Sequence, residues 1–517
     1  MLAVVLASAS FFSRGSYSTT FTTDTLYLAN AGYLVYHGLV PHVDFAWQFG
    51  GYDAALIALA MRLFRVSVKA VEQGVALHYL VAVMLLVLVT QRRASWPVFG
   101  LLFVLLTVTA LTRYPFENGP HPNLALQSYS MWYNRIGWTL AFVVFTPLLL
   151  GPPRLRGSEL VACGLAMFLI LVTKITFTLL FPLAFLLIWR RSGWRGTVTV
   201  LGAIIGAMLA GWALFGFSPS AYMAMPADNY RGVRDLLAAS PKFGPFDKLA
   251  YMVLVQAIPL VSLAVAGAFI WWKIPSRRGA VLATFAVVVV GLGVSVSTGT
   301  FYALDAVTPI IPFAAIILGS YALEAKHWQT ASALALYVLA FATPYGLNYA
   351  AGIVKEATRS RQSIYASGPL EGLVIEKIDQ NSSPRFASRQ EALSYIRRRG
   401  ELEGGMDWAT DYEWNYLVDD AMQLVTASPD ARKLRIGSFF QGISSFALGT
   451  APLKSYSFML GVTAPDTPQT IPADVDALLL PRFHSSSASN KHYGHDVEAN
   501  FVAVATSAFW ELRVRRH

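Results

Sequence analysis

The feature that most limits how this chain can fold is a series of long apolar stretches within its first 349 residues. A helix that crosses the hydrocarbon core of a bilayer needs about 20 mostly apolar residues. Hydrophobic residues make up 55% of the chain and charged residues only 14%, which is typical of a membrane protein with many spans. The apolar stretches are 2–12, 71–90, 97–112, 132–150, 160–172, 177–189, 198–217, 249–272, 281–296, 304–323 and 331–347. They predict an all-α polytopic membrane domain of about 11 transmembrane helices.

Two interpretations of the short first stretch, 2–12, stay open. It is either the end of a span that starts upstream or a signal peptide. The sequence shows neither a basic flank nor a small-residue cleavage site, which disfavours the signal peptide.

The distribution of charge predicts the orientation of the spans. The first 349 residues carry 22 basic and 11 acidic side chains, whereas the remainder carries 18 and 19. Cytoplasmic loops are enriched in Lys and Arg. If the N-terminus is inside and each stretch crosses once, every short inner loop is basic. These loops hold Arg92, Arg93, Arg154, Arg156, Arg190, Arg191, Arg195, Lys273, Arg277, Arg278 and Lys326. The basic excess is therefore a topology signal, and no nucleic-acid partner is expected.

The acids of the membrane region show the opposite distribution. In this topology only Glu159 and Glu324 lie in inner loops. The other nine fall outside or at the outer boundary: Asp24, Asp44, Asp53, Glu72, Glu117, Asp228, Asp235, Asp247 and Asp305. Acids close to lipid are costly and mark polar cavities or active sites. The set indicates chemistry at the outer face.

The segment between the first two spans is too long for a hairpin. It contains two amphipathic stretches, 26–37 and 52–64. The second is apolar enough to resemble a span, but a crossing there would invert every later loop. Both are therefore expected to be helices that lie on the outer membrane interface.

The last third of the chain differs in character. Short apolar strands are expected at 373–378, 434–440, 477–480, 501–505 and 510–514, and helices at 389–399 and 414–426. Alternating strands and helices predict a small α/β domain. The expected organisation is a transmembrane domain over 1–349 and a soluble extracytoplasmic domain over 350–517.

The sequence lacks the motifs that several common kinds of active site require. Cys163 is the only cysteine, so neither a disulfide framework nor a thiolate metal site is expected. The sequence contains no P-loop, no G-x-S-x-G and no H-E-x-x-H motif.

Asp24 and Asp44 are the first candidates for catalysis. Asp24 follows the first apolar stretch and is either a cap of the next helix or a general base that faces a cavity at bilayer level. Asp44 belongs to a Pro-His-x-Asp turn, which is more often structural. His42 and Asp44 together supply only two metal ligands, too few for a site. Asp53 is expected to cap the second interfacial helix.

The first outer segment resembles that of the GT-C glycosyltransferases, which are multispan enzymes that use polyprenyl-phosphate-linked sugars. The residues that carry the resemblance are Asp24, then Gly38, Pro41, Asp44 and Phe45 in G-x-x-P-x-x-D-F, followed by the apolar stretch 50–64. Many relatives have paired acids at the first position, whereas Asp24 stands alone between threonines. The resemblance therefore implies a lone base rather than a metal site.

The second outer loop, 113–131, holds Glu117 and His121 among proline and glycine. The resemblance implies a second acid in this loop, and Glu117 is the only one available; an ordinary turn is the alternative. Tyr133, Asn134 and Arg135 begin the next span. Arg135 is placed for a phosphate clamp or for snorkelling to the interface, and His42, His121, Tyr133 and Asn134 are candidates for contacts to acceptor or sugar.

Lys174 interrupts two apolar stretches in Thr-Lys-Ile-Thr and leaves almost no outer loop. It either snorkels or binds an anion, and similar Lys-Thr turns in GT-C relatives imply a donor phosphate. The loop 218–248 contains Arg231 and Arg234, which either bind that phosphate or anchor the loop to anionic lipid.

The GT-C resemblance, taken with the predicted topology, implies an inverting glycosyltransferase in the bacterial inner membrane. Its partners would be a polyprenyl-phosphate sugar donor, a glycan, lipid or protein acceptor, and membrane lipids. No cofactor is expected to be required; a divalent metal is the alternative, but no paired-acid motif supports it. The alternatives are a transporter or flippase of lipid-linked saccharides, which usually shows internal repeats, and an enzyme of the O-antigen ligase or polymerase type.

Overall fold

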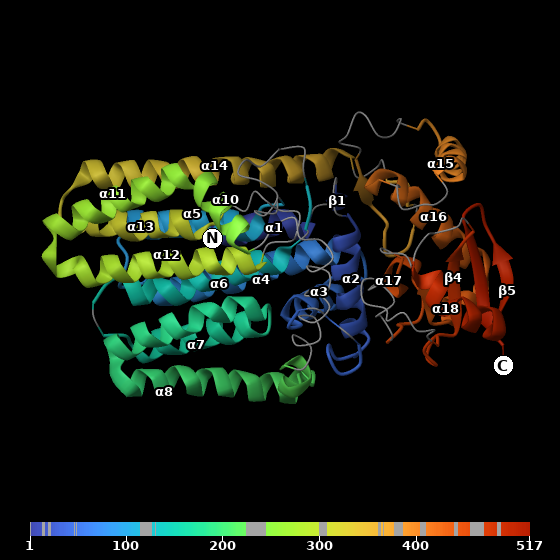
Figure 1. Ribbon diagram of the computed structural model, residues 1–517, viewed down its shortest axis with the longest axis horizontal. Coiled ribbons are helices and arrows are strands. Elements are labelled where there is room, and N and C mark those ends of the chain that lie inside the picture. Colours follow the sequence, from blue (N-terminus) through green and yellow to red (C-terminus); the bar gives the residue numbers. More distant parts are fainter. Residues whose placement is uncertain are drawn as a thin grey trace.

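The computed structural model describes residues 2–12, 16–18, 22–45, 47, 49–113, 127–129, 131–152, 154–223, 245–298, 308–359, 363–365, 367–376, 386–403, 410–438, 443–454, 470–482 and 488–516. Figure 1 shows an elongated molecule. Most long helices run along its long axis, and a small sheet stands at one end.

The helices of the elongated part follow the apolar stretches closely. They are α1 (Leu2–Phe12), α4 (Lys69–Thr90), α5 (Trp96–Leu111), α6 (Trp132–Leu149), α7 (Gly157–Leu171), α8 (Phe181–Phe215), α10 (Pro245–Val255), α11 (Ala257–Lys273), α12 (Arg278–Thr298), α13 (Ile310–Glu324) and α14 (Trp328–Arg359). Two 3-10 turns, η1 (Ile175–Leu180) and η2 (Pro275–Arg277), connect some of them. The helix α8 is broken at Gly193, whose φ of 62° lies in the left-handed region.

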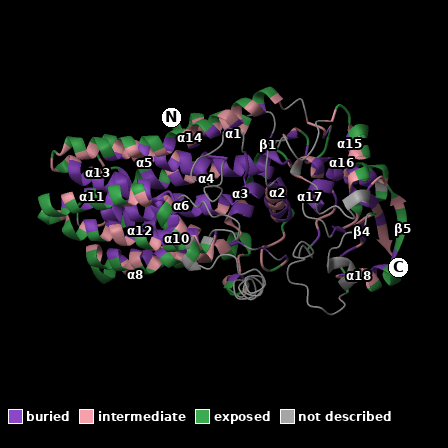
Figure 2. Cartoon of the chain, turned by 45° about the horizontal axis from the view of Figure 1, so that its top comes forward, coloured by how far each residue is buried: buried purple, intermediate pink, exposed green. Residues whose placement is uncertain are grey.

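Four helical segments of the described chain are long and apolar enough to cross a membrane, or five if α10 and α11 form one bent span. The helices α1, α5, α7 and α13 are apolar but shorter. The expected count of about 11 transmembrane helices is therefore not confirmed. Figure 2 shows buried residues along the middle of the bundle and exposed ones on its outer helices. Large apolar side chains are exposed there, such as Trp212 at 63% and Val265 at 65%, as expected for surfaces that face lipid.

The basic connections gather at one end of the bundle, which we call the basic end. The Arg93 side chain bonds to the carbonyls of Leu150, Pro152 and Arg154. The Arg191 side chain also bonds to the Leu150 and Pro152 carbonyls. These contacts bring the α4–α5, α6–α7 and mid-α8 connections together, in agreement with the charge pattern of the sequence.

The opposite end, which we call the sheet end, carries two further helices. These are α2 (Thr22–Tyr36) and α3 (Tyr52–Leu63), and they pack against each other and against α4. Both helices were expected, with boundaries within a few residues. In Figure 1 they lie between the bundle and the sheet.

The C-terminal region builds a four-stranded sheet with helices beside it. The strands β3 (Ile436–Ser438), β4 (Ala477–Pro481), β6 (Trp510–Arg515) and β5 (Phe501–Thr506) lie in that order. The pair β3–β4 is parallel, and the other two pairs are antiparallel. The helices are α15 (Arg389–Glu403), α16 (Asp411–Ala427), α17 (Ser445–Leu448) and α18 (Ala488–Asn500), with a 3-10 turn η4 (Pro429–Lys433). A small α/β unit was expected, and its strands fall where the sequence predicts them.

One predicted strand pairs elsewhere. The strand β2 (Leu373–Ile375) lies parallel to β1 (Ser16–Ser18), so the segment after α1 pairs with the segment after α14. This two-stranded sheet therefore joins the chain just after the first helix of the membrane region to the chain just after its last helix.

A network of buried charges lies at the sheet end of the bundle. The Arg113 guanidinium bonds to Glu356 Oε1 at 2.5 Å and lies 3.1 Å from Glu72 Oε1. The Lys69 ammonium contacts both carboxylates, and the Tyr129 hydroxyl donates to Glu72 at 2.6 Å. Two cations and two anions therefore connect the start of α4, the segment after α5 and the end of α14.

Candidate active site

Asp24 lies in the first turn of α2, as the third residue of that helix, and its side chain is half-buried. The helix begins at Thr22, so Asp24 does not occupy the capping position that was its structural alternative. The positive end of a helix dipole stabilises a carboxylate in the first turn, which favours the ionised form that a general base needs.

Lys174 lies between α7 and η1 and contacts two other predicted site residues. Its ammonium donates a hydrogen bond to Asn134 Oδ1 at 2.9 Å and lies 4.6 Å from the centre of the Tyr133 ring. Asn134 is buried and Tyr133 half-buried, both at the start of α6. The structure therefore brings Lys174, Tyr133 and Asn134 into one group, with the cation held against an aromatic face.

The chain before α3 is attached directly to the Lys174 turn. The Gly50 N–H donates to the Thr173 carbonyl at 2.9 Å, and the Tyr52 N–H donates to the Val172 carbonyl at 3.0 Å. A Cβ atom at Gly50 would lie 2.1 Å from the carbonyl carbon of Val172. Only glycine fits this close approach. The two hydrogen bonds hold together two segments that lie far apart in the sequence.

A row of four aromatic rings connects the Asp24 helix to Lys174. Tyr27 stacks on Trp47 at 4.6 Å between ring centres, Trp47 meets Phe49 edge-on at 5.4 Å, and Phe49 stacks on Tyr133 at 3.7 Å. Tyr27 lies three residues after Asp24, so the two share a face of α2. Trp47 and Phe49 are buried, whereas Tyr27 and Tyr133 are half-buried and expose the two ends of the row.

Asp53 is buried completely beside this row. It lies in the first turn of α3, where Gly51 is the capping residue, so the expectation that Asp53 caps the helix is wrong. Its Oδ1 accepts hydrogen bonds from the Trp47 indole at 3.3 Å and from the Ala54 N–H at 2.9 Å. Burial raises the pKa of Asp53 to about 6, because these two bonds offset only part of the cost of desolvating a carboxylate.

The Asp44 carboxylate forms hydrogen bonds within its own turn and with the C-terminal region. Its carboxylate accepts from the Val40 N–H at 2.9 Å and from Lys454 at 3.0 Å. The Val40 hydrogen bond, aided by Lys454, holds the pKa of Asp44 below its ordinary value. These contacts favour the structural interpretation of the Pro-His-x-Asp turn.

His42 lies in the same turn, with a left-handed φ of 68°. Its ring is 5.1 Å from the ring of Tyr222, and burial lowers the pKa of His42 to about 4. The imidazole is therefore neutral at pH 7.

Arg135 is buried and donates a hydrogen bond to the Thr112 carbonyl, so its guanidinium is held within the bundle. Its role in phosphate binding stays a prediction. Glu117, His121, Arg231 and Arg234 lie outside the described residues.

The described residues contain no group of three His, Cys, Asp or Glu side chains that are placed to hold a metal. The candidate groups among them are a carboxylate near one end of the packed aromatic row and an ammonium at the other. Partly exposed aromatic rings such as Tyr27 and Tyr133 are of the kind that contact the apolar face of a ring-shaped ligand, and an ammonium is of the kind that contacts a phosphate.

Sequence reasoning missed the row itself. Part of its signal was present in the sequence, because Phe45, Trp47 and Phe49 alternate with other residues, a pattern typical of a segment with one buried side. All three are buried. Trp47 and Phe49 of this set belong to the row. The Arg113–Glu356 contact was also missed, since no local pattern connects residues so far apart.

No protein-family model and no curated protein matches the chain. The chain is similar to two solved structures of ArnT from Cupriavidus metallidurans. The apo structure matches with 12% identity and a TM-score of 0.47, and the structure bound to undecaprenyl phosphate with 13% identity and a TM-score of 0.48. Each match covers 99% of this chain and 96% of the other.

Proposed function

We propose that this protein is an integral-membrane glycosyltransferase. It takes a sugar from a polyprenyl-phosphate donor at the outer face and transfers it to a hydroxyl of a glycan, lipid or protein. The observation that carries the proposal is the aromatic row between the Asp24 helix and the Lys174 turn. It holds a candidate base and a candidate phosphate site in one packed arrangement, with the partly exposed rings of Tyr27 and Tyr133 at its two ends.

In this proposal Lys174 binds the donor phosphate. Asn134 accepts one hydrogen of the ammonium, and the ammonium lies against the Tyr133 ring, so its position is fixed before the donor arrives. A fixed cation that neutralises charge developing on a leaving group is usually a large contribution to catalysis. A lipid monophosphate can be stabilised in this way without a metal.

Asp24 is the proposed base. The acceptor hydroxyl gives its proton to the Asp24 carboxylate, and the acceptor oxygen forms a bond to the anomeric carbon from the face opposite the phosphate. The bond between that carbon and the phosphate oxygen breaks, and its electron pair leaves with the lipid phosphate. Configuration at the anomeric carbon is inverted. Proton transfer of this kind contributes about 10²–10⁴-fold to the rate.

The sheet end is the outer face in this proposal, because the basic end follows the positive-inside rule. The C-terminal region after residue 350 would then lie outside the cytoplasm. The helix α14 continues to Arg359, so it would carry the chain beyond the membrane surface before the C-terminal region begins.

The role of Lys174 is tested by Lys174→Ala. Loss of a hydrogen bond to a charged group costs about 1.5–3 kcal/mol, so the dissociation constant for a polyprenyl-phosphate sugar should rise about 10- to 150-fold. The measurement is donor binding by the purified protein in detergent.

The control for this test is Lys326→Ala, which removes a lysine at the basic end. It should leave donor affinity unchanged. An unchanged affinity in Lys174→Ala would remove Lys174 from the donor site.

A further inference from the structure

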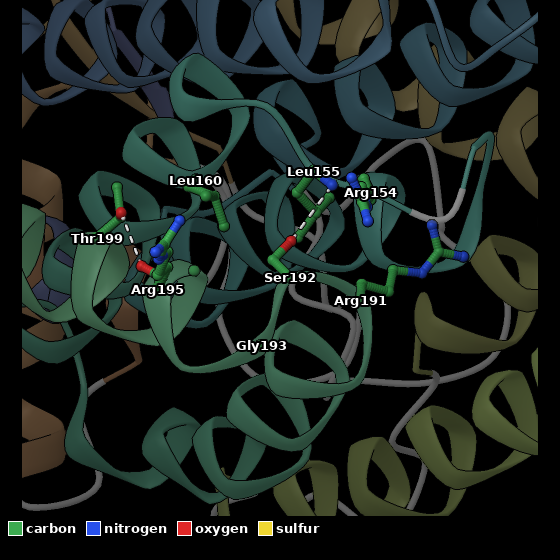
Figure 3. A pocket seen from close by; sticks show the side chains of 9 residues that line it. Arg154, Leu155, Leu160, Arg191, Ser192, Gly193, Arg195 and Thr199 are labelled. Atoms are coloured by element: carbon green, nitrogen blue, oxygen red, sulfur yellow. Dashed lines mark hydrogen bonds between the residues drawn. The ribbon is translucent and has the colours of Figure 1, made fainter.

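A polar pocket lies at the basic end of the bundle, at the opposite end from the candidate active site. Its volume is about 580 Å³, and three arginines line it: Arg154 from the connection before α7, and Arg191 and Arg195 from the break in α8. Figure 3 shows these side chains around the turn, with Ser192 between Arg191 and Arg195.

The backbone at the break shapes the pocket. Gly193 has a left-handed φ of 62°, which turns α8 back on itself between its two halves. The Ser192 hydroxyl accepts a hydrogen bond from the Leu155 N–H at 3.3 Å, which attaches the turn to the Arg154 segment. Thr199 bonds to the carbonyl of Arg195 at 2.9 Å, within the second half of α8. A hydrogen bond therefore joins the two chain segments that form the walls of the pocket.

The pocket has an unbalanced positive charge. Among the described residues, none of its three arginines forms an ion pair with a carboxylate. Glu159 is the acid closest in sequence, and both of its carboxylate oxygens are occupied by Arg93, at 2.6 and 2.7 Å. Arg191 is held by carbonyls such as those of Pro147 and Pro152, which do not cancel its charge. An anion is the ligand that such a site binds most favourably.

The surroundings of the pocket are those of a membrane interface. Trp189 and Trp194 beside it are both 62% exposed, and exposed tryptophan is enriched at the level of lipid headgroups. Beyond the pocket, α7 exposes Val161 and α8 exposes Val198 and Ile205, which provides an apolar path for acyl chains.

We propose that this pocket binds the headgroup phosphate of an anionic phospholipid from the cytoplasmic leaflet. Basic pockets between helices on the cytoplasmic side bind anionic headgroups. The arginines would contact the phosphate, while the exposed apolar side chains of α7 and α8 contact the acyl chains. The site is separate from the proposed donor site and does not depend on the proposed transfer reaction.

The test is native mass spectrometry of the full-length protein in detergent with added phosphatidylglycerol, cardiolipin or phosphatidylcholine. The wild type should retain the two anionic lipids and release phosphatidylcholine. The variant Arg154→Ala/Arg195→Ala should bind the anionic lipids at least about tenfold more weakly, because each basic residue near an anionic lipid contributes appreciably to binding. Both side chains are exposed, so the variant should fold; elution as a single species in gel filtration checks this.

The matched control is Lys273→Ala/Arg278→Ala, which removes the same charge at the same end outside the pocket lining. It should retain the anionic lipids. Equal loss in both double variants, or full retention in Arg154→Ala/Arg195→Ala, would overturn the pocket assignment. Displacement of the lipid by millimolar inorganic phosphate alone would contradict a lipid ligand, because free phosphate would then be the better occupant.

Discussion

Asp53 is a buried carboxyl group whose ionisation opposes folding. Its folded pKa, raised by burial to about 6, exceeds its ordinary value, so the native state holds the proton more tightly than the unfolded state does. The contribution of Asp53 to stability is therefore full below about pH 4 and is lost as the pH rises to about 6.

We expect Asp53→Asn to remove this dependence. Between pH 4 and 6 the Tm of the wild type should fall relative to that of Asp53→Asn as the pH increases. The measurement is thermal unfolding of both proteins in the same detergent across that range. Parallel curves would show that Asp53 is not buried as described.

Asp44 provides a control of opposite sign. The Val40 hydrogen bond lowers the pKa of Asp44, so its stabilising contribution is present above its ordinary pKa and is lost as the pH falls through the lowered value. Asp44→Asn should therefore lower the Tm by a constant amount above about pH 4, and this difference from the wild type should shrink as the pH falls further.

Some single-residue roles could be predicted from the sequence, and others could not. Lys174 stood out because a cation interrupted two apolar stretches, and its contacts with Asn134 and Tyr133 agree with a site there. Asp44 was considered for catalysis, but its partner Lys454 lies 410 positions away. No local pattern reveals such a partner.

At the scale of elements, the buried charges at Arg113 hold three parts of the bundle together. Removing one partner of a buried ion pair leaves an uncompensated charge and costs about 3–5 kcal/mol. Glu356→Gln should therefore lower the free energy of unfolding by roughly that amount, because Arg113 and Lys69 would then share only Glu72. Unfolding in mixed detergent micelles measures the change.

The comparison variant for this network is Glu371→Gln. Glu371 pairs with Arg65 at 3.3 Å, but both side chains are about half exposed, and exposed pairs contribute about 0–1 kcal/mol. A loss in Glu356→Gln no larger than in Glu371→Gln would show that the network does not stabilise the bundle.

Elements were predictable where composition alone determines them. Long apolar stretches gave the bundle helices, and four of the five predicted strands lie in the main sheet. The pairing of β1 with β2 was not predictable, because three residues show no periodicity and their partner is set by how α1 and α14 pack.

At the scale of the whole molecule, the C-terminal region docks onto α2. The buried side chain of Asn30 accepts a hydrogen bond from the Phe446 N–H at 3.1 Å, and the Tyr33 hydroxyl donates to the Thr450 carbonyl at 2.9 Å. The helix α2, which carries Asp24, therefore also positions α17. The candidate site and the C-terminal region both contact this helix.

We expect Asn30→Ala to weaken this docking by about 1–3 kcal/mol, because it leaves the Phe446 N–H buried without a partner. Hydrogen exchange of residues 445–450 should become faster. The control is Lys454→Ala, which removes the more exposed contact to Asp44 and should change exchange much less. Equal effects of the two variants would argue against docking through Asn30.

The most direct test of the proposed function is transfer of a radiolabelled sugar from polyprenyl-phosphate donors by the purified protein and by Asp24→Asn. The wild type should transfer the label to an acceptor. Asp24→Asn should fold, bind the donor with unchanged affinity and transfer about 10²–10⁴-fold more slowly, because the acceptor proton then has no base. Near-normal turnover by Asp24→Asn would contradict the account.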